Sequence, residues 1–185
     1  MLQLSSQDKQ LLLSIARGAV RSHLEEASFR RPEITSDSLS VPCGAFVSIH
    51  REAQLRGCIG RIEAESPLYQ TTAECAVSAA VSDPRFAPVM IEELESLSFE
   101  ISVLSVLEKV VSFDRLEVGR HGLLAEKDGK RGLLLPQVAV QCGWDRSEFL
   151  SQTCEKAGLP PEAWKAGAQI FAFEASVFSE GITVR

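Results

Sequence analysis

The chain has 185 residues, of which 45% are hydrophobic and 24% are charged, and a formal net charge of -6 at pH 7. These values are typical of a globular protein with a sizeable core, and they exclude collagen-like, disordered and membrane-spanning chains. The acidic balance disfavours a general electrostatic attraction to nucleic acid and leaves only a local basic patch for such a role.

Apolar residues recur every three or four positions over 6–26, which predicts an amphipathic helix. The polar, proline-containing stretch 27–43 predicts a surface loop. Alternation of apolar and polar residues over 44–50, followed by a polar turn and the run 55–62, predicts two neighbouring strands.

Ser66 and Pro67 predict the start of a second helix, with Ser66 as the cap and Pro67 in the first turn. This helix is expected to end near Ser82, because two prolines interrupt the following stretch 83–88. Alternation over 98–104 then predicts a half-buried strand.

Segments 122–127 and 130–135 flank Asp128-Gly129, which predicts a hairpin because this dipeptide tolerates positive φ angles. A helix over 145–157 and a last strand over 169–177 complete the chain. Strands joined by short turns, interrupted by helices without a β-α-β repeat, indicate an α+β fold with a mainly antiparallel sheet and flanking helices.

Cysteine usage and the N-terminus bear on the compartment. The five cysteines are an odd number at irregular intervals, and polar residues stand where the apolar stretch of a secretory signal would begin. No apolar run approaches the roughly 18 residues that span a bilayer. We therefore expect a cytoplasmic protein with reduced thiols and no membrane association.

The hexapeptide Leu-Arg-Gly-Cys-Ile-Gly at 55–60 is the principal candidate site. Glycine inside a strand sacrifices packing, so Gly57 and Gly60 indicate either a bulge or the close approach of backbone or ligand. Cys58 is a candidate nucleophile, because cations such as Arg56 lower the pKa of a thiol. The alternative is a buried, unreactive thiol.

A nucleophilic cysteine needs a base within hydrogen-bond reach. His121, in a turn before the hairpin, is the best candidate, with a plain turn residue as the alternative. His50 ends the strand that precedes the hexapeptide, and it reaches Cys58 only if the two strands form a tight hairpin.

Asp83 and Arg85 share a rigid turn, which suits either a fixed salt bridge or a fork that holds a carboxylate or phosphate. Glu100, on the polar side of its strand, is a candidate partner for Arg85 or Arg56. The sequence contains no metal-ligand motif and no phosphate-binding loop, so we expect neither a metal nor a cofactor.

The hexapeptide and five further segments resemble the AMMECR-type family. These segments are Asp83–Phe86, Glu100–Ser105, Gly119–Gly122, Leu135–Ala139 and Cys154–Leu159. The resemblance covers nearly the whole chain, and all six residues of the family signature match. The compact form is similar to proteins of the prokaryotic AmmeMemoRadiSam system, which are encoded with a radical SAM enzyme and a Memo-like protein.

This resemblance implies one domain, 1–185, with a larger lobe at 1–112 plus 168–185, a smaller lobe at 113–167, and a cleft between them. It implies an accessory or binding protein that acts with a radical SAM enzyme and a Memo-like protein in a modification pathway. A cleft enzyme using Cys58 on an anionic substrate, a nucleic-acid-related housekeeping factor and a purely architectural motif are the alternatives. The candidate ligand-binding residues, for a small anionic ligand or nucleic acid, are Arg56, Gly57, Gly60, Asp83, Arg85 and Glu100.

Overall fold

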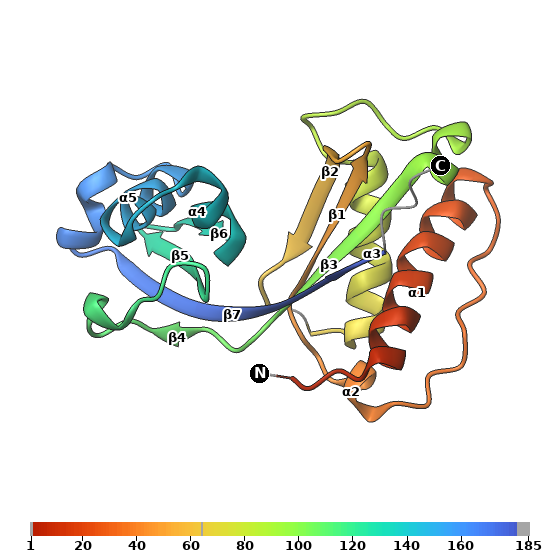
Figure 1. The fold of residues 1–185 in the computed structure, drawn as a ribbon, viewed down its shortest axis with the longest axis horizontal. Coiled ribbons are helices and arrows are strands. Elements are labelled where there is room, and N and C mark those ends of the chain that lie inside the picture. The colour runs from red at the N-terminus through yellow and green to blue at the C-terminus, as the bar shows by residue number, and fades with distance from the viewer. Residues whose placement is uncertain (1, 64, 181–185) are drawn as a thin grey trace. The chain divides into compact units, whose positions relative to one another are not determined.

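The computed structural model of the chain describes residues 2–63 and 65–180 (Figure 1). The remaining positions of the expected domain 1–185 lie outside the described residues. The chain divides into a larger unit, Leu2–Leu104 with the described part of Ser176–Arg185, and a smaller unit, Ser105–Ala175.

The sheet of the larger unit contains three antiparallel strands in the order β2-β1-β3, and the C-terminal end of β7 (Gln169–Ser179) lies next to β3. Helices cover one face of this sheet. The elements of the larger unit are α1 (Ser6–Leu24), α2 (Asp37–Ser40), β1 (Ala45–Arg51), β2 (Gln54–Arg61), α3 (Leu68–Val81), the 3-10 helix η1 (Ile91–Ser96) and β3 (Leu97–Leu104). Helices α1 and α3 pack against each other and against the strands (Figure 1). The predicted strand pair, first helix and half-buried strand are confirmed.

The two faces of this sheet differ in chemistry, because successive side chains of a strand point to opposite sides. Val47, Ile49, Phe99 and Ile101 point toward the helices and are fully buried. The opposite face is more polar. We call it the Cys58 face, and its members are Phe46, Ser48, His50, Cys58, Gly60, Ser98, Glu100 and Ser102.

The smaller unit is an antiparallel sheet in the order β4-β7-β5-β6, covered by short helices. Its elements are β4 (Glu108–Lys109), η2 (Phe113–Arg115), β5 (His121–Lys127), β6 (Lys130–Leu134), α4 (Pro136–Cys142), α5 (Arg146–Lys156), η3 (Pro161–Lys165) and β7 (Gln169–Ser179), which continues into the larger unit. The predicted hairpin is confirmed, since Asp128 and Gly129 have φ angles of 52° and 77°. All strand pairs described are antiparallel, which confirms the α+β class.

The smaller unit spans Ser105–Ala175, whereas the family resemblance led us to expect a smaller lobe at 113–167. The physical reason is strand pairing, because Glu108 and Lys109 of β4 pair with Ala172 and Phe171 of β7.

The start of α3 differs from the prediction. Pro67, rather than Ser66, is the cap residue, and no side chain caps the helix. The carbonyl of Ser66 instead accepts a hydrogen bond from the Thr71 hydroxyl. The helices α2 and α4 were not predicted, because each is at most seven residues long and shows no clear helical period.

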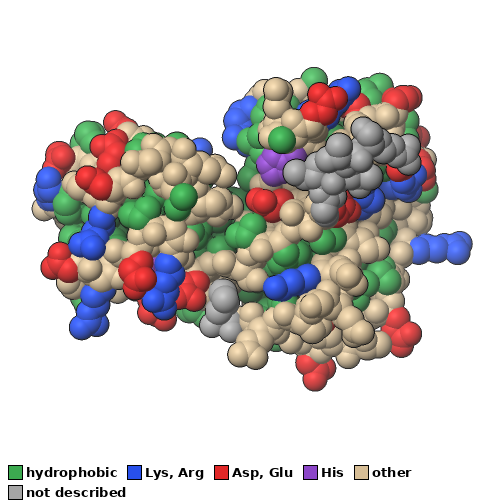
Figure 2. All heavy atoms as spheres, in the orientation of Figure 1, with side chains coloured by type: hydrophobic (Ala, Val, Ile, Leu, Met, Phe, Trp, Pro, Cys, Tyr) green, Lys and Arg blue, Asp and Glu red, His purple; other side chains and the backbone are tan. Residues whose placement is uncertain are grey.

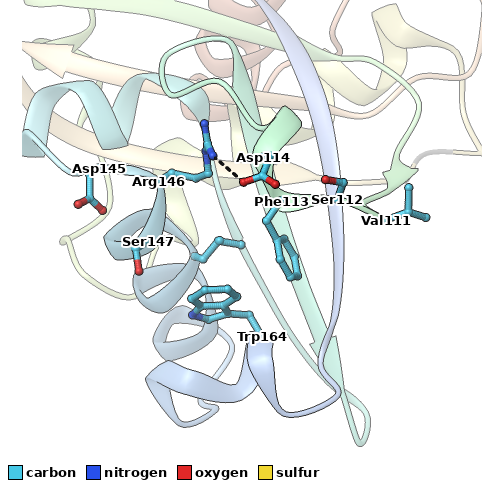
Figure 3. A pocket seen from close by; sticks show the side chains of 9 residues that line it. Val111, Ser112, Phe113, Asp114, Asp145, Arg146, Ser147 and Trp164 are labelled. Carbon is cyan, nitrogen blue, oxygen red and sulfur yellow. Dashed lines mark hydrogen bonds and ion pairs between the residues drawn. The ribbon is translucent and has the colours of Figure 1, made fainter.

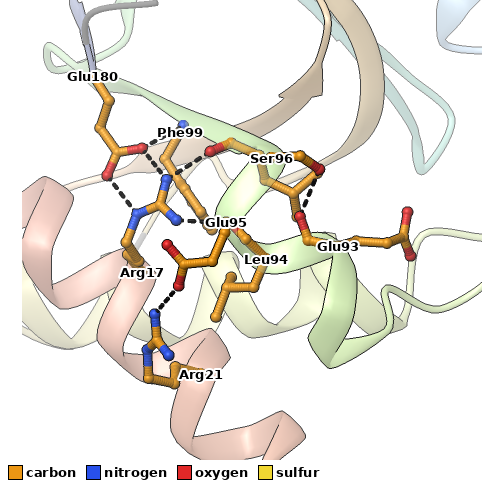
Figure 4. Close-up of polar contacts among 9 residues, drawn as sticks. Arg17, Arg21, Glu93, Leu94, Glu95, Ser96, Phe99 and Glu180 are labelled. Atoms are coloured by element: carbon orange, nitrogen blue, oxygen red, sulfur yellow. Dashed lines mark hydrogen bonds and ion pairs between the residues drawn. The ribbon is translucent and has the colours of Figure 1, made fainter. Parts of the chain in front are cut away.

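The end of β7 is fixed to the larger unit by a guanidinium cluster (Figure 4). Arg17 of α1 donates to both carboxylate oxygens of Glu180, at 2.9 and 2.6 Å, and to the carbonyls of Leu94 and Leu97. Glu180 also accepts from the backbone N–H of Phe99, whose ring lies 4.9 Å from the Arg17 guanidinium carbon. The bidentate geometry joins α1, β3 and the C-terminal end of β7.

We expect Glu180→Gln to lower the free energy of unfolding by about 1 to 2 kcal/mol, because it removes the charge from a partly buried bidentate pair. Arg21→Gln, which removes a more exposed ion-pairing arginine from the same helix, should cost about 0.5 kcal/mol or less. Urea unfolding of the two variants checks this. Equal losses of unfolding free energy in the two variants would contradict a special role for the guanidinium cluster of Arg17 and Glu180.

Within the described ranges, no helix combines the length and the apolar character required to cross a bilayer.

Candidate functional site

Cys58 lies on the edge strand β2, directly opposite Ser48 of β1, which in turn lies opposite Glu100 of β3. The Ser48 hydroxyl donates to the Cys58 sulfur at 3.2 Å. The three side chains therefore form one row across the Cys58 face, and the central Ser48 is buried while Cys58 and Glu100 are partly exposed.

The Asp83-Arg85 turn covers the free edge of β2 at Cys58. The Asp83 carboxylate accepts from the backbone N–H of Cys58 at 2.8 Å, and Arg85 Nη2 donates to the Cys58 carbonyl at 3.3 Å. Both backbone groups of Cys58 thus point away from β1, as they do in a non-hydrogen-bonded antiparallel pair. The turn takes the place that a further strand would occupy.

Asp83 and Arg85 also form the salt bridge that their spacing predicts. Arg85 Nε and Nη2 donate to the two carboxylate oxygens at 2.9 and 2.6 Å. Asp83 is buried and the Arg85 side chain is half exposed. Hydrogen bonds from the Arg85 side chain, aided by the backbone N–H groups of Cys58 and Arg85, hold the pKa of Asp83 well below its usual range.

Arg56 occupies a bulge in β2, where Ile49 pairs with Gly57 and the next residue, His50, pairs with Leu55. All three of its guanidinium nitrogens donate to the connection between α3 and β3. Their acceptors are both carboxylate oxygens of Glu93, at 3.2 and 3.1 Å, and the carbonyls of Ala87 and Pro88. Arg56 therefore anchors this connection.

The two glycines of the hexapeptide allow close packing on opposite faces of β2. A Cβ atom on Gly57 would lie 2.1 Å from the Ala79 carbonyl oxygen of α3, and one on Gly60 would lie 2.2 Å from the Phe46 ring. At Gly57 the close approach is made by helix backbone. The predicted ligand contacts of the two glycines stay predictions.

The Cys58 thiol is not activated by the arginines near it in sequence. Arg56 and Arg51 pair with Glu93, and Arg61 pairs with Glu74. Burial raises the pKa of Cys58, and the Ser48 hydrogen bond and the Arg85 charge offset this only in part. The thiol is accordingly the dominant form at neutral pH.

Glu100 is the unusual residue of the row. Neither Arg56 nor Arg85, its two expected partners, pairs with it, because these arginines bind Glu93 and Asp83. Over the described residues, the Glu100 carboxylate has no hydrogen-bond or ion-pair partner, and the same holds for the His50 ring, diagonal to it on the Cys58 face. Both side chains are partly exposed and so remain free to bind a ligand.

His121 is the first residue of β5 in the smaller unit, rather than a turn residue as predicted, because it pairs with Glu174 of β7. Its Nδ1 accepts from the backbone N–H of Glu117 at 3.0 Å. This bond leaves Nε2 as the remaining polar atom of the ring. The pairing of His121 with Cys58, and the cleft that would contain them, stay predictions. No group of three metal-ligating side chains occurs in the part of the chain that the structure describes.

Sequence reasoning did not identify two residues of this site, Ser48 and Glu93. Ser48 is one of several serines in strands, and only its register opposite Cys58 distinguishes it. Glu93 lies in η1, a 3-10 helix that the sequence pattern did not predict.

Fold and site together define a protein of two α+β units in which a thiol between two glycines lies on an edge strand capped by an Asp-Arg turn. The AMMECR1 family model matches residues 13–178. The chain therefore belongs to the AMMECR1 family.

Several proteins are similar to this chain over most of its length. A protein of Thermofilum pendens is 42% identical over 96% of this chain and 92% of its own length. A protein of Methanothermobacter thermautotrophicus is 41% identical over 96% of both chains. The crystal structure of the uncharacterised protein PH0010 from Pyrococcus horikoshii superposes with a TM-score of 0.87 at 40% identity, over 92% of this chain and 90% of that one.

The state of the Cys58 thiol can be tested by alkylation. We expect iodoacetamide to modify Cys58 in the folded protein at least about tenfold more slowly than the exposed Cys142 at pH 7, because a raised pKa lowers the thiolate fraction. The rate should rise with pH beyond the ordinary thiol range near 8.5. Mass spectrometry of the two cysteine-containing peptides measures both rates. A fast reaction at neutral pH would contradict the neutral thiol.

Proposed function

We propose that this chain is a cytoplasmic accessory or binding protein of a modification pathway, acting with a radical SAM enzyme and a Memo-like protein. The resemblance of the hexapeptide and its companion segments supports the partnership. Five free cysteines favour a reducing compartment. The Cys58 face is the binding site of this proposal, and its occupant is a small polar ligand.

The observation that carries the proposal is the carboxylate of Glu100 beside the ring of His50, neither of which has a hydrogen-bond or ion-pair partner among the described residues. A partly buried carboxylate is best satisfied by a hydrogen-bond donor or a cation. The arginines that would attract an anion already bind Glu93, Glu74 and Asp83. We therefore infer a ligand with a donor group, such as an amine or a guanidinium.

The neutral Cys58 thiol favours a binding role over covalent catalysis, because the thiolate is the nucleophilic form. The nucleic-acid alternative receives little support, because acidic and basic side chains are interspersed on the face that Figure 2 shows and the net charge is -6.

The ligand class is tested by NMR titration of the 15N-labelled full chain with agmatine, which carries donors, and with glutarate, a dicarboxylate. We expect agmatine to shift the amides of Ser48, Cys58 and Glu100. Glu100→Gln should abolish these shifts, whereas the exposed control Glu108→Gln and the variant Cys58→Ser should retain them. Unchanged agmatine binding by Glu100→Gln would overturn the proposed ligand site.

The partnership is tested separately. Co-expression with the radical SAM enzyme and the Memo-like protein of the same organism should give a complex, or a modified product, that neither partner gives without this chain. Identical products with and without the chain would contradict the partnership.

A thiol-dependent enzyme is the second candidate, and one observation favours it. His50 shares the Cys58 face with Cys58 and is thus an alternative base to His121. This enzyme requires Cys58, so loss of pathway function in Cys58→Ser, with retention in Glu100→Gln, would select it over the binding protein.

A further inference from the structure

The smaller unit contains a pocket of about 670 Å³ whose residues belong to this unit alone (Figure 3). Its walls come from the segment after β4, the start of α5 and η3. The apolar part consists of Val111, Phe113, Leu150 and Trp164. The rings of Phe113 and Trp164 pack edge to face, with 5.2 Å between their centroids. We call this ring pair the aromatic floor of the pocket.

The chain leading into this pocket is unusually apolar for a surface segment. Val106 and Val111 are 83% and 90% exposed, the highest values among the large hydrophobic side chains that the structure describes. Between them lies β4, which pairs only with β7 among the described strands and is therefore an edge strand. An exposed edge next to an apolar pocket is the arrangement by which proteins bind extended peptides.

The rim of the pocket favours a basic residue on the bound segment. Asp114 is 97% exposed, and its one ion pair, with Arg146, is long at 3.4 Å. Asp145 caps α5 with one carboxylate oxygen. Two of the nearby cations have partners of their own, since Arg146 also donates to the Leu116 carbonyl and Lys165 pairs with Glu162, whereas Arg115 next to Asp114 is exposed.

We propose that the smaller unit binds an extended segment of a partner protein, which pairs with β4 and inserts one large apolar side chain between Val111, Leu150 and the aromatic floor. A lysine or arginine next to this apolar residue meets Asp114. The surface shares no residue with the Cys58 face, so the two proposals can fail independently.

Two blocked pentapeptides serve as probes. One has a central phenylalanine between two lysines with valine at each end, and the other has glutamates in place of the lysines. In NMR titrations of the 15N-labelled full chain, the lysine peptide should shift amides of 106–114 and 145–150. We expect it to bind about tenfold more tightly than the glutamate peptide at low ionic strength.

Two pairs of variants locate the contacts. Val111→Ser should lower the affinity for the lysine peptide by about fivefold. Val140→Ser, which removes an exposed valine outside the pocket, should leave this affinity unchanged. Asp114→Asn should reduce the preference for lysine over glutamate, whereas Asp128→Asn in the hairpin turn should preserve it. Equal affinity for the two peptides, shifts confined to other residues, or absence of any shift would overturn the proposal.

Discussion

Asp83→Ala is expected to lower the free energy of unfolding by about 3 kcal/mol, the largest effect of any single polar substitution near Cys58. The carboxylate is buried and accepts four hydrogen bonds, from the backbone N–H groups of Cys58 and Arg85 and from Arg85 Nε and Nη2. Its removal leaves the β2 edge without an acceptor at Cys58 and releases the turn that covers that edge. Urea unfolding followed by circular dichroism measures the loss.

Asp114→Ala is the matched control, because Asp114 also pairs with an arginine but is 97% exposed. Its loss should cost about 0.5 kcal/mol or less, as is usual for exposed ion pairs. If both alanine variants were equally stable, the edge-capping role of Asp83 would be untenable.

The pH dependence of stability follows from the same carboxylate. The folded pKa of Asp83 lies below the unfolded value of about 3.9, so the unfolded chain binds more protons as the pH falls. The stabilisation by Asp83 is complete above about pH 5 and decreases through the ordinary carboxyl range toward the folded pKa. The difference in unfolding free energy between the natural protein and Asp83→Asn should therefore shrink from pH 5 to pH 3. If this difference in unfolding free energy stayed constant with pH, the destabilisation of Asp83→Asn would come from altered hydrogen-bond geometry rather than from the lost charge.

Local patterns in the sequence were sufficient for the hairpin and for the described strands of five or more residues, but not for the two-residue β4. The alternation in β1 and β3 separates a helix-covered face from a polar one, and Asp128-Gly129 sets the turn between β5 and β6 through its own backbone preference. The polar placement of Glu100 also follows from alternation.

The partners of the site residues could not be predicted in the same way. The bulge at Arg56 interrupts alternation and sends its side chain to Glu93, 37 residues further along the chain. The contact between Asp83 and the Cys58 amide depends on β2 being an edge strand, which is a property of the assembled sheet. The unpartnered state of Glu100 becomes visible only once these two pairs are known.

Gly57→Ala is expected to destabilise the protein by about 3 kcal/mol or more, although it adds a single methyl group. That methyl group would lie 2.1 Å from the Ala79 carbonyl oxygen and 3.1 Å from its carbon, both of which are backbone atoms of α3. Backbone cannot rotate away as a side chain does, so α3 must move off the sheet and disturb the core formed with β1 and β2. Chemical unfolding of purified protein gives the loss.

Gly60→Ala provides the comparison within the same hexapeptide. Its methyl group would lie 2.2 Å from Cγ of Phe46, a partly exposed side chain that can give way only by changing its χ1 rotamer, so the expected cost is about 1 to 2 kcal/mol. A large loss at Gly57 with a smaller loss at Gly60 would assign Gly57 to the packing of α3 on the sheet and Gly60 to a contact with the movable Phe46 side chain. The reverse order would contradict this assignment, because it would require the Phe46 ring to be held more rigidly than the backbone of α3.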